Sequence, residues 1–464
     1  MQNTTSTVPR AHWLLVFGLG FLVRVLYILA MAPENRLYDS FSDQPIYWDM
    51  ARNLLAGKGF MVGIPAFVSD MHVPTAIQPP FYLFFLAGVF GVFGVDNLLA
   101  VRLVQSAFGA ATCVFVYEIG RRLYSKRIGL AAGLVMTVYP LHVVFTRVIM
   151  IEAVHTSVVT LLMLAVVIAF KEAREGVHRI WRYVALGALF GVAFPARPEL
   201  VAMIGVLAVL VLGSAWLRQP RRLRAPLGAL ALMSVICLAL ALPFALRNLV
   251  VMGKFTFLPT KQWGLWETNW LRYMRDKEPA WEVNCTHKDR MRCALPDFDQ
   301  LTEIERESRL ARIGTQVVFD HPVEYLRYSV SRLFVSYPLW PRESFPPPLG
   351  YLGARERPDD GAGHDVIDDY PLYFTIPEKL RVWAFRGVFA LALIGLLATA
   401  RERKVAALPI LAMLGINIAL SFLFFGRERY RFLTDPYWIL LAVYGVSWVS
   451  QTWRARQAPV AIAA

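Results

Sequence analysis

Long apolar stretches constrain the fold of this sequence more than any other feature. Hydrophobic residues make up 56% of its 464 residues and charged residues only 18%, a mixture that is too apolar and too poor in charge for an ordinary soluble protein. An apolar run of about 18 residues or more indicates a helix that crosses a membrane. The sequence therefore predicts an all-α polytopic membrane protein. Its predicted spans are residues 13–32, 98–120, 128–147, 152–170, 181–196, 199–217, 226–246, 382–400, 405–425 and 436–452.

The basic residues between these spans predict the orientation of the chain. Four segments rich in Lys and Arg fall on one side when ten spans are counted, and the positive-inside rule makes that side cytoplasmic. The segments are "RRLYSKR" (121–127), "RQPRRLRA" (218–225), "RERK" (401–404) and "WRAR" (453–456). The net charge of +14 gathers in such connectors, so we attribute it to membrane orientation and expect no nucleic-acid partner.

One further apolar segment, residues 79–94, allows two interpretations. Counting it as a span would place residues 121–127 outside and break the charge pattern. The segment is also short for a bilayer and begins with two prolines. We interpret it as a helix that lies in the outer interface or enters it partway, with an eleventh span as the alternative.

The spans divide the chain into three parts. Residues 1–246 form an N-terminal transmembrane catalytic module, whose first extracytoplasmic loop covers residues 33–97. Residues 247–381 are too long for a simple loop and predict a small extracytoplasmic domain. Residues 382–464 contain the last transmembrane helices.

The predicted extracytoplasmic domain contains two further features. Cys285 and Cys293 can form a disulfide if the domain faces an oxidising compartment, and two free thiols are the alternative. Residues 322–340 form a short amphipathic piece that we expect to lie on the membrane surface.

Two acidic residues are predicted to meet at the outer end of the bundle. Asp43 follows the first span, and its carboxylate could deprotonate a hydroxyl nucleophile or cap the helix predicted at residues 44–56. Glu152 is the first residue of a predicted span and has apolar neighbours in the sequence. An ionisable residue is costly in such surroundings and indicates a function. The alternative is a carboxylate that reaches water or pairs with Arg147. Two spans separate the acids, so both lie at the same face.

Arginines accumulate at the same depth. Each alone could be an interfacial anchor, but together they offer the guanidinium donors that a lipid phosphate or pyrophosphate needs. The candidates for binding a donor phosphate are Arg102, Arg147, Arg197, Arg247, Arg429 and Arg431. With no P-loop, dinucleotide fingerprint or HExxH motif in the sequence, these residues predict a polyprenyl-phosphate substrate.

Several segments, taken in order, resemble a known family. They are "DQPIYWDMARNLLAGKGF" (43–60), "QPPFYLFFLAGVFGVFGVDNLLAVRL" (78–103), "GRRLYSKRIGLAAGLVMTVYPL" (120–141), "VIMIEAV" (148–154), "PFALRNLVVMGKF" (243–255) and "RERYRFLTDP" (427–436). The sequence resembles the GT-C membrane glycosyltransferases, specifically glycosyltransferase family 39, which includes protein O-mannosyltransferases and lipid A aminoarabinose transferases. The resemblance implies a GT-C fold.

The resemblance also implies an activity and roles for particular residues. These enzymes transfer a sugar from a polyprenyl phosphate to an acceptor hydroxyl on the extracytoplasmic side and invert the anomeric centre. By resemblance, Asp43 is the general base, Glu152 the second-loop acid and Arg247 a donor-phosphate contact. Tyr47 and Gln78 are expected to bind substrate.

The sequence departs from the family at two positions. Gln44 stands where many members have the second acid of an Asp-Glu pair, and Gln78 stands where some have Lys or His. Both departures bear on the acceptor, which we expect to be a protein, a glycolipid or a polysaccharide.

The predicted setting is the bacterial cytoplasmic (inner) membrane, with the lipid bilayer as a partner and the active site outside. We expect no cofactor, and the scheme is compatible with a divalent metal. Two other functions fit parts of the sequence: a transporter or flippase of lipid-linked saccharides, and a membrane-anchored binding protein that works through residues 247–381.

Overall fold

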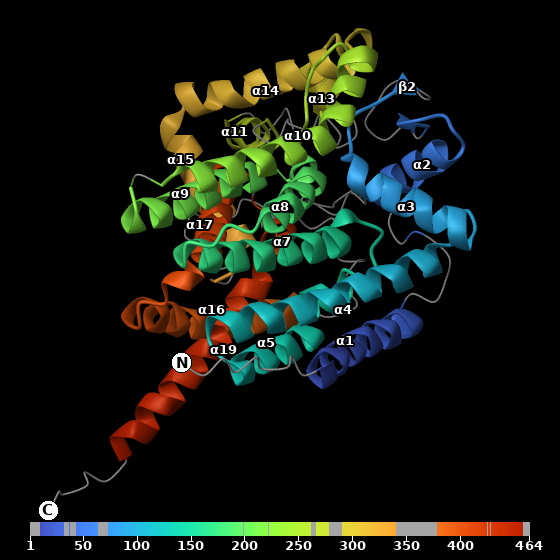
Figure 1. The fold of residues 1–464 in the computed structure, drawn as a ribbon. Helices are drawn as coiled ribbons and strands as arrows, with labels where there is room; N and C mark the ends of the chain where they lie inside the picture. The colour runs from blue at the N-terminus through green and yellow to red at the C-terminus, as the bar shows by residue number, and fades with distance from the viewer. Residues whose placement is uncertain are drawn as a thin grey trace, which may run out of the picture.

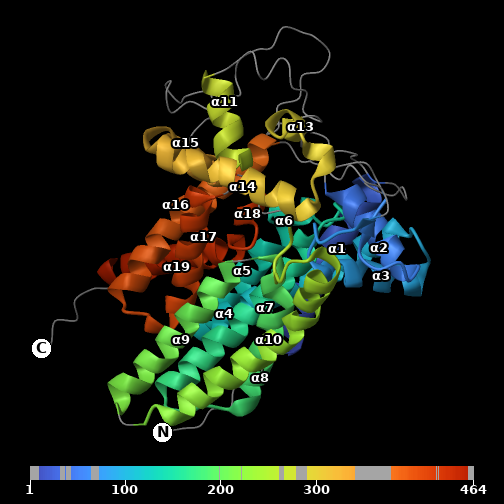
Figure 2. The same ribbon diagram turned by 90° about the horizontal axis from the view of Figure 1, so that it is seen from above.

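The computed structural model describes residues 10–31, 37, 43–63, 73–197, 199–220, 222–260, 266–277, 290–339, 378–424, 426 and 428–457. Within these residues the chain is a bundle of long helices with shorter helices gathered at one end (Figures 1 and 2). The bundle helices are α1 (Arg10–Met31), α4 (Leu98–Leu123), α5 (Lys126–Val138), α6 (Pro140–Val144), α7 (Ile151–Arg174), α8 (Ile180–Ala193), α9 (Glu199–Arg218), α10 (Arg224–Met252), α16 (Glu378–Arg401), α17 (Leu408–Leu423) and α19 (Asp435–Gln457).

Seven helices of the described residues are long and apolar enough to cross a membrane, namely α1, α4, α7, α9, α10, α16 and the helical segment Val405–Leu423 that includes α17. Helices α5 with α6, α8 and α19 occupy the other three predicted spans. The protein is therefore a multi-pass membrane protein, and each of the ten predicted spans corresponds to helical structure.

The span predicted at residues 128–147 is wrong in one respect, because it is not one continuous helix. Helix α5 ends at Val138, Tyr139 is extended with φ −65° and ψ 118°, and α6 begins at Pro140. A proline ring disfavours the helical conformation of the residue before it. The break therefore follows from the Tyr139–Pro140 step.

Helix α10 extends beyond the predicted end at residue 246. It continues through Pro243 to Met252 and ends at Gly253, whose φ of 72° suits glycine at the end of a helix. Arg247 therefore lies inside this helix and not in the segment that follows it.

The described part of the first loop forms a small structure beside the bundle. It consists of α2 (Gln44–Leu55), the antiparallel pair β1 (Met61–Val62) and β2 (Val73–Pro74), and α3 (Pro80–Phe93). Helices α2 and α3 lie side by side at one end of the bundle (Figure 1). Helix α3 has 14 residues and is about 21 Å long, which is shorter than a hydrocarbon core of about 30 Å.

Basic connectors gather at the opposite end of the bundle, as the charge pattern predicted. Lys171 Nζ donates to the carbonyl of Arg122 at 3.0 Å, and Arg218 Nη1 donates to the carbonyl of Arg174 at 2.7 Å. These bonds join the ends of α7, α4 and α9. The connectors at 121–127 and 218–220 therefore share one end.

The segment between α10 and α16 contributes short helices that cover the end of the bundle nearest the first loop (Figure 2). The described elements are η2 (Trp266–Trp270), α11 (Leu271–Lys277), α13 (Arg290–Ala294), η3 (Phe298–Gln300), α14 (Glu303–Asp320) and α15 (Pro322–Ser336), followed after α17 by α18 (Glu428–Arg431). Cys293 is disulfide-bonded. Cys285 lies outside the described residues, so its pairing with Cys293 stays a prediction.

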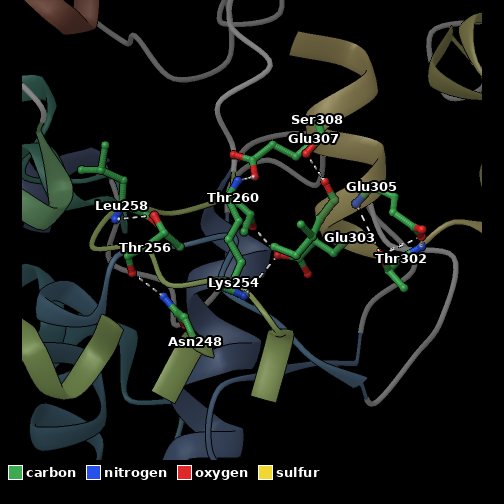
Figure 3. A network of polar contacts seen from close by, with 12 residues as sticks. Asn248, Lys254, Thr256, Leu258, Thr260, Thr302, Glu303, Glu305, Glu307 and Ser308 are labelled. Carbon is green, nitrogen blue, oxygen red and sulfur yellow. Dashed lines mark hydrogen bonds and ion pairs between the residues drawn. The ribbon is translucent and has the colours of Figure 1, made fainter. Parts of the chain in front are cut away.

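A polar network fastens α14 to the rest of the protein (Figure 3). Lys254 Nζ, just after α10, donates to Glu307 Oε2 at 2.7 Å, and Thr260 Oγ1 donates to Glu303 Oε1. Thr302 and Glu305 form a capping box at the start of the helix, which satisfies two of its free N–H groups. Helix α14 is thereby fixed above α10.

Two hydrophobic cores hold the arrangement together. The larger lies within the bundle, where α16 and α19 approach so closely that a Cβ on Gly395 would overlap the carbonyl of Leu441. The second joins Tyr82 of α3 and Met50 of α2 to α4, α7 and Leu310 of α14. Because this second core contains residues of the first loop and of α14, it fixes both segments against the start of α7.

Candidate active site

Asp43 lies immediately before α2 and forms an ion pair with Arg429 of α18. Arg429 Nη1 donates to Asp43 Oδ2 at 3.0 Å, and both side chains are largely buried. Asp43 occupies the N-cap position of α2, but its side chain makes no capping hydrogen bond. The carboxylate therefore serves the ion pair and not the helix, although the sequence allowed either role.

Glu152 lies in the first turn of α7 and pairs with Arg197, which follows η1 (Phe194–Ala196). The distance from Arg197 Nη2 to Glu152 Oε1 is 3.5 Å, and the Glu152 side chain is only 3% exposed. The alternative in which this carboxylate reaches water is therefore wrong. Glu152 is a buried acid, and we find its ion-pair partner in Arg197.

Tyr430 connects the two ion pairs. The guanidinium carbon of Arg197 lies 5.2 Å from the centre of the Tyr430 ring, and that of Arg429 lies 5.3 Å from it. Arginines at this distance are attracted to the face of an aromatic ring. Asp43, Arg429, Tyr430, Arg197 and Glu152 thus form one continuous chain of contacts, which sequence analysis missed because it did not single out Tyr430.

Tyr47 of α2 lies within the field of the same four charges. Burial raises the pKa of its hydroxyl well above the ordinary value, and the carboxylates of Asp43 and Glu152 raise it further, while Arg429 and Arg197 oppose them. Its ring packs edge-to-face on another tyrosine of α3 at 4.9 Å. Tyr47 is therefore a neutral, buried neighbour of both ion pairs.

The turn that leads into Glu152 is held by side chains of α4. Gln105 Nε2 donates to the carbonyls of Thr146 at 3.3 Å and Val148 at 3.0 Å. Arg102 Nε donates to the intervening carbonyl of Arg147 at 2.9 Å. Arg102 is fully buried, so it helps to hold this turn in place. Arg147 is also buried in the turn.

Gln44 links this turn to the first loop. Its Oε1 accepts a hydrogen bond from the backbone N–H of Ile149 at 2.9 Å, and the side chain is fully buried. Gln44 is adjacent to Asp43, and Ile149 lies three residues before Glu152. The bond therefore fixes the spacing between the segments that carry the two acids.

Arg247 lies beside the first loop, where it binds backbone carbonyls. Its Nη1 donates to the carbonyl of Thr75 at 2.9 Å, and its Nη2 donates to the carbonyl of Phe60 at 3.1 Å. The backbone N–H of Ala76, next to Thr75, donates to Glu303 Oε1 at 3.1 Å. Arg247 and α14 together hold the strand that leads to α3.

Arg431 lies away from the two ion pairs in the described contacts. Its Nε donates to Asp435 Oδ1 at 2.8 Å and its Nη1 to the carbonyl of Ser336 at 2.8 Å, with the guanidinium 3.6 Å from the centre of the Phe385 ring. These contacts tie α18 to α19, α15 and α16. The sequence placed Arg431 with the other arginines only because it is two residues from Arg429.

Gln78 lies at the entrance to α3 and is buried. Its Nε2 has no hydrogen-bond partner among the described residues. Three residues later, the ring of Phe81 packs against His155 of α7, with the ring centres 6.4 Å apart. His155 was not predicted as a site residue, although it follows Glu152 by three positions and so shares its helix face.

Among the described residues, no group of three or more His, Cys, Asp or Glu side chains could hold a metal ion. The candidate site is instead two buried acids, each paired with an arginine. Such pairs can accept a proton at a carboxylate and donate hydrogen bonds from a guanidinium to an anion.

Comparisons with known proteins find that parts of the chain are similar to glycosyltransferases. Residues 77–246 match the family model of dolichyl-phosphate-mannose-protein mannosyltransferases. No curated protein sequence matches the chain.

Solved structures extend the likeness over nearly the whole chain. An oligosaccharyltransferase from Archaeoglobus fulgidus tethered to an acceptor peptide is 13% identical, with a TM-score of 0.53 over 97% of this chain and 51% of that one. The same enzyme in complex with Zn and sulfate matches over 96% and 50%, with 13% identity and a TM-score of 0.53. This chain thus spans about half the length of those structures. ArnT from Cupriavidus metallidurans bound to undecaprenyl phosphate is 15% identical over 95% and 78%, with a TM-score of 0.41. The two oligosaccharyltransferase structures show the fold of this chain, which is the GT-C fold.

Proposed function

We propose that this protein is an integral-membrane glycosyltransferase that moves a sugar from a polyprenyl-phosphate donor to an acceptor hydroxyl. The observation that carries the proposal is the continuous chain of contacts from Asp43 through Arg429, Tyr430 and Arg197 to Glu152. It brings a carboxylate that can accept a proton next to guanidinium groups that can bind a phosphate. Two such pairs at one end of a GT-C bundle support a lipid-linked anionic donor.

In the proposed reaction, Asp43 takes the proton of the acceptor hydroxyl as its oxygen attacks the anomeric carbon. The bond between the anomeric carbon and the phosphate oxygen breaks, and the polyprenyl phosphate leaves with the bonding electrons. Attack opposite the leaving group inverts the anomeric centre. The donor carries its own leaving group, so the scheme includes no cofactor.

Arg429 and Arg197 are the proposed contacts of the donor phosphate. Guanidinium groups that already face the phosphate stabilise the charge that moves onto it, without reorganisation during the reaction. Arg102, Arg247 and Arg431 take a different role in this proposal, since their described hydrogen bonds go to backbone carbonyls, to Asn248 or to Asp435. These three arginines hold the segments around the candidate site in place and do not contact the donor phosphate.

The match of residues 77–246 to mannosyltransferases that use dolichyl phosphate mannose supports a polyprenyl-phosphate donor. The acceptor is proposed to be a protein, a glycolipid or a polysaccharide. We place the protein in the bacterial inner membrane with its site on the extracytoplasmic face, because the basic connectors lie at the opposite end of the bundle.

The experiment uses the purified protein in lipid nanodiscs with radiolabelled undecaprenyl-phosphate sugars and extracted envelope acceptors. Transfer of label to an acceptor is expected from the wild type and lost in Asp43→Asn. Arg247→Ala is expected to weaken donor binding, because the first loop loses its anchor. Label that crosses the bilayer of a vesicle without reaching any acceptor would instead favour a flippase.

A further inference from the structure

The first two turns of α7 present three polar side chains on one face. Glu152, His155 and Thr156 are related by three and four positions, so they are neighbours on the helix surface. Their exposed fractions are 3%, 1% and 1%. A polar face this deeply buried needs hydrogen-bond partners.

Each of the three side chains has one polar atom without such a partner among the described residues. These atoms are Glu152 Oε2, His155 Nδ1 and Thr156 Oγ1. The remaining atoms are engaged, since Glu152 Oε1 faces Arg197 at 3.5 Å and His155 Nε2 lies 3.0 Å from the carbonyl of Ala193. Leaving a buried polar atom unpaired costs about 1–3 kcal/mol, and three adjacent ones indicate a place for a polar ligand.

The chemistry of the three atoms selects the ligand. A carbonyl oxygen only accepts, so His155 Nε2 carries the proton and Nδ1 presents a lone pair. Glu152 Oε2 also accepts, and Thr156 Oγ1 can do either. A ligand here must therefore donate, which excludes an ionised phosphate or carboxylate. The guanidinium of Arg197 next to Glu152 disfavours a cation. A neutral hydrogen-bond donor remains, and the hydroxyl groups of a sugar are donors of this kind.

The surroundings suit a sugar ring. The Phe81 ring packs against His155 at 6.4 Å between centres, and the apolar faces of sugar rings stack on aromatic side chains. Arg197, the partner of Glu152, contacts the Tyr430 ring, and Arg429 contacts the same ring. A donor phosphate bound by these two arginines would therefore have its sugar near this face of α7.

We propose that Glu152, His155 and Thr156 form a subsite that accepts hydrogen bonds from hydroxyl groups of the transferred sugar and so determines which sugar is used. This inference rests on the proposed function. His155 and Thr156 are specificity determinants in it, and Glu152 belongs both to this subsite and to the candidate active site.

The test measures kcat/KM for undecaprenyl phosphates that carry hexoses or pentoses, and for singly deoxygenated analogues of whichever sugar the wild type transfers. The variants are His155→Phe, which keeps an aromatic ring, and Thr156→Val, which keeps the shape. Thr160→Val is the matched control, because the Thr160 hydroxyl already donates within the helix to the carbonyl of Thr156 at 2.7 Å.

We expect one deoxygenated analogue to lose about 10- to 100-fold in kcat/KM with the wild type. With the intact sugar, kcat/KM of His155→Phe should fall by a similar factor. With the analogue that lacks the hydroxyl bound by His155, this variant should be little worse than the wild type. Thr156→Val should behave in the same way with the analogue that lacks the hydroxyl bound by Thr156. Thr160→Val should keep the wild-type pattern. If His155→Phe does not fold, Thr156→Val decides the outcome.

The subsite is overturned if, for every deoxygenated analogue, the fold-loss in kcat/KM caused by the substitution and that caused by the missing hydroxyl simply multiply. The side chain and the hydroxyl then act independently. In that case the proposed function stands, since the wild type still transfers sugar. If the wild type transfers none of the sugars, the proposed function fails and the subsite fails with it.

Discussion

Replacing Asp43 with asparagine separates the two tasks that the proposal gives to its ion pair. The wild-type carboxylate accepts a hydrogen bond from Arg429 at 3.0 Å, and both side chains are largely buried. Asparagine keeps the shape and can still accept a hydrogen bond. It removes the negative charge and the ability to take a proton from the acceptor.

The magnitudes follow from these two losses. General-base catalysis contributes about 100- to 10,000-fold to a rate, so transfer by Asp43→Asn should fall by that factor. Donor binding should change in the opposite direction. A hydrogen bond to a charged group contributes about 1.5–3 kcal/mol and a neutral one about 0.5–1.5 kcal/mol. In the variant, Arg429 would therefore give up its hydrogen bond to residue 43 for one to the donor phosphate at a cost roughly 1 kcal/mol lower than in the wild type. This difference corresponds to about a fivefold gain in donor affinity.

Two measurements on one preparation test this prediction. Single-turnover transfer from a radiolabelled undecaprenyl-phosphate sugar gives the chemical step, and equilibrium binding of the same donor in nanodiscs gives its affinity. Asp96→Asn is the matched control. It also removes a carboxylate from an arginine pair next to α2, at 3.4 Å from Arg52 Nε, but outside the candidate active site, and should change neither quantity more than twofold.

The reasoning is refuted if Asp43→Asn transfers sugar within tenfold of the wild type, because Asp43 then cannot be the base. It is equally refuted if the variant binds the donor much more weakly while remaining folded. That result would show that the pair orders the donor site and does not compete with the phosphate.

Three other changes test the supporting contacts. Arg247→Lys should lower the melting temperature in detergent by several degrees, because one ammonium cannot replace a guanidinium that bonds two loop carbonyls; an unchanged melting temperature would count against the anchoring role. Gln105→Leu should cost about 1–3 kcal/mol, because it leaves the Thr146 carbonyl unpaired while the Val148 carbonyl keeps the N–H of Met150; the measurement is reduced thermal stability, and stability equal to the wild type would contradict the account. Hydrogen bonds to Thr302 lower the pKa of Glu305 in the folded protein, so its contribution to stability is present at neutral pH and is lost as the pH falls through that lowered pKa. The stability difference between wild type and Glu305→Gln should therefore shrink on acidification, and a difference that grows would show the wrong sign.

The sequence predicted the helices and the position of the two acids well, for a physical reason. Helices that cross a bilayer need long apolar runs, so each of the ten predicted spans could be located from local composition. Counting spans also places Asp43 and Glu152 at the same end. The breaks at Pro140 and the extension of α10 to Met252 depend on one or two residues and were missed.

The partners of the charged residues could not be predicted from the sequence. In the sequence, Arg247 and Arg429 both lie near the predicted outer ends of spans. In the structure, Arg247 binds backbone carbonyls and Arg429 binds a carboxylate. The difference depends on which chain segments pack beside them. Tyr430 was missed because an aromatic between two arginines is common at a membrane surface, and its position between the ion pairs exists only in three dimensions.

The ion pair between Asp43 and Arg429 joins residues that are 386 positions apart. During synthesis, the ribosome releases the first of these residues long before the second. The Asp43 carboxylate therefore waits without this partner while most of the bundle is inserted, and an incomplete chain cannot assemble the candidate site. A nascent chain that stalls before α18 would lack both Arg429 and Tyr430, so the candidate site is complete only after α18 has joined the bundle.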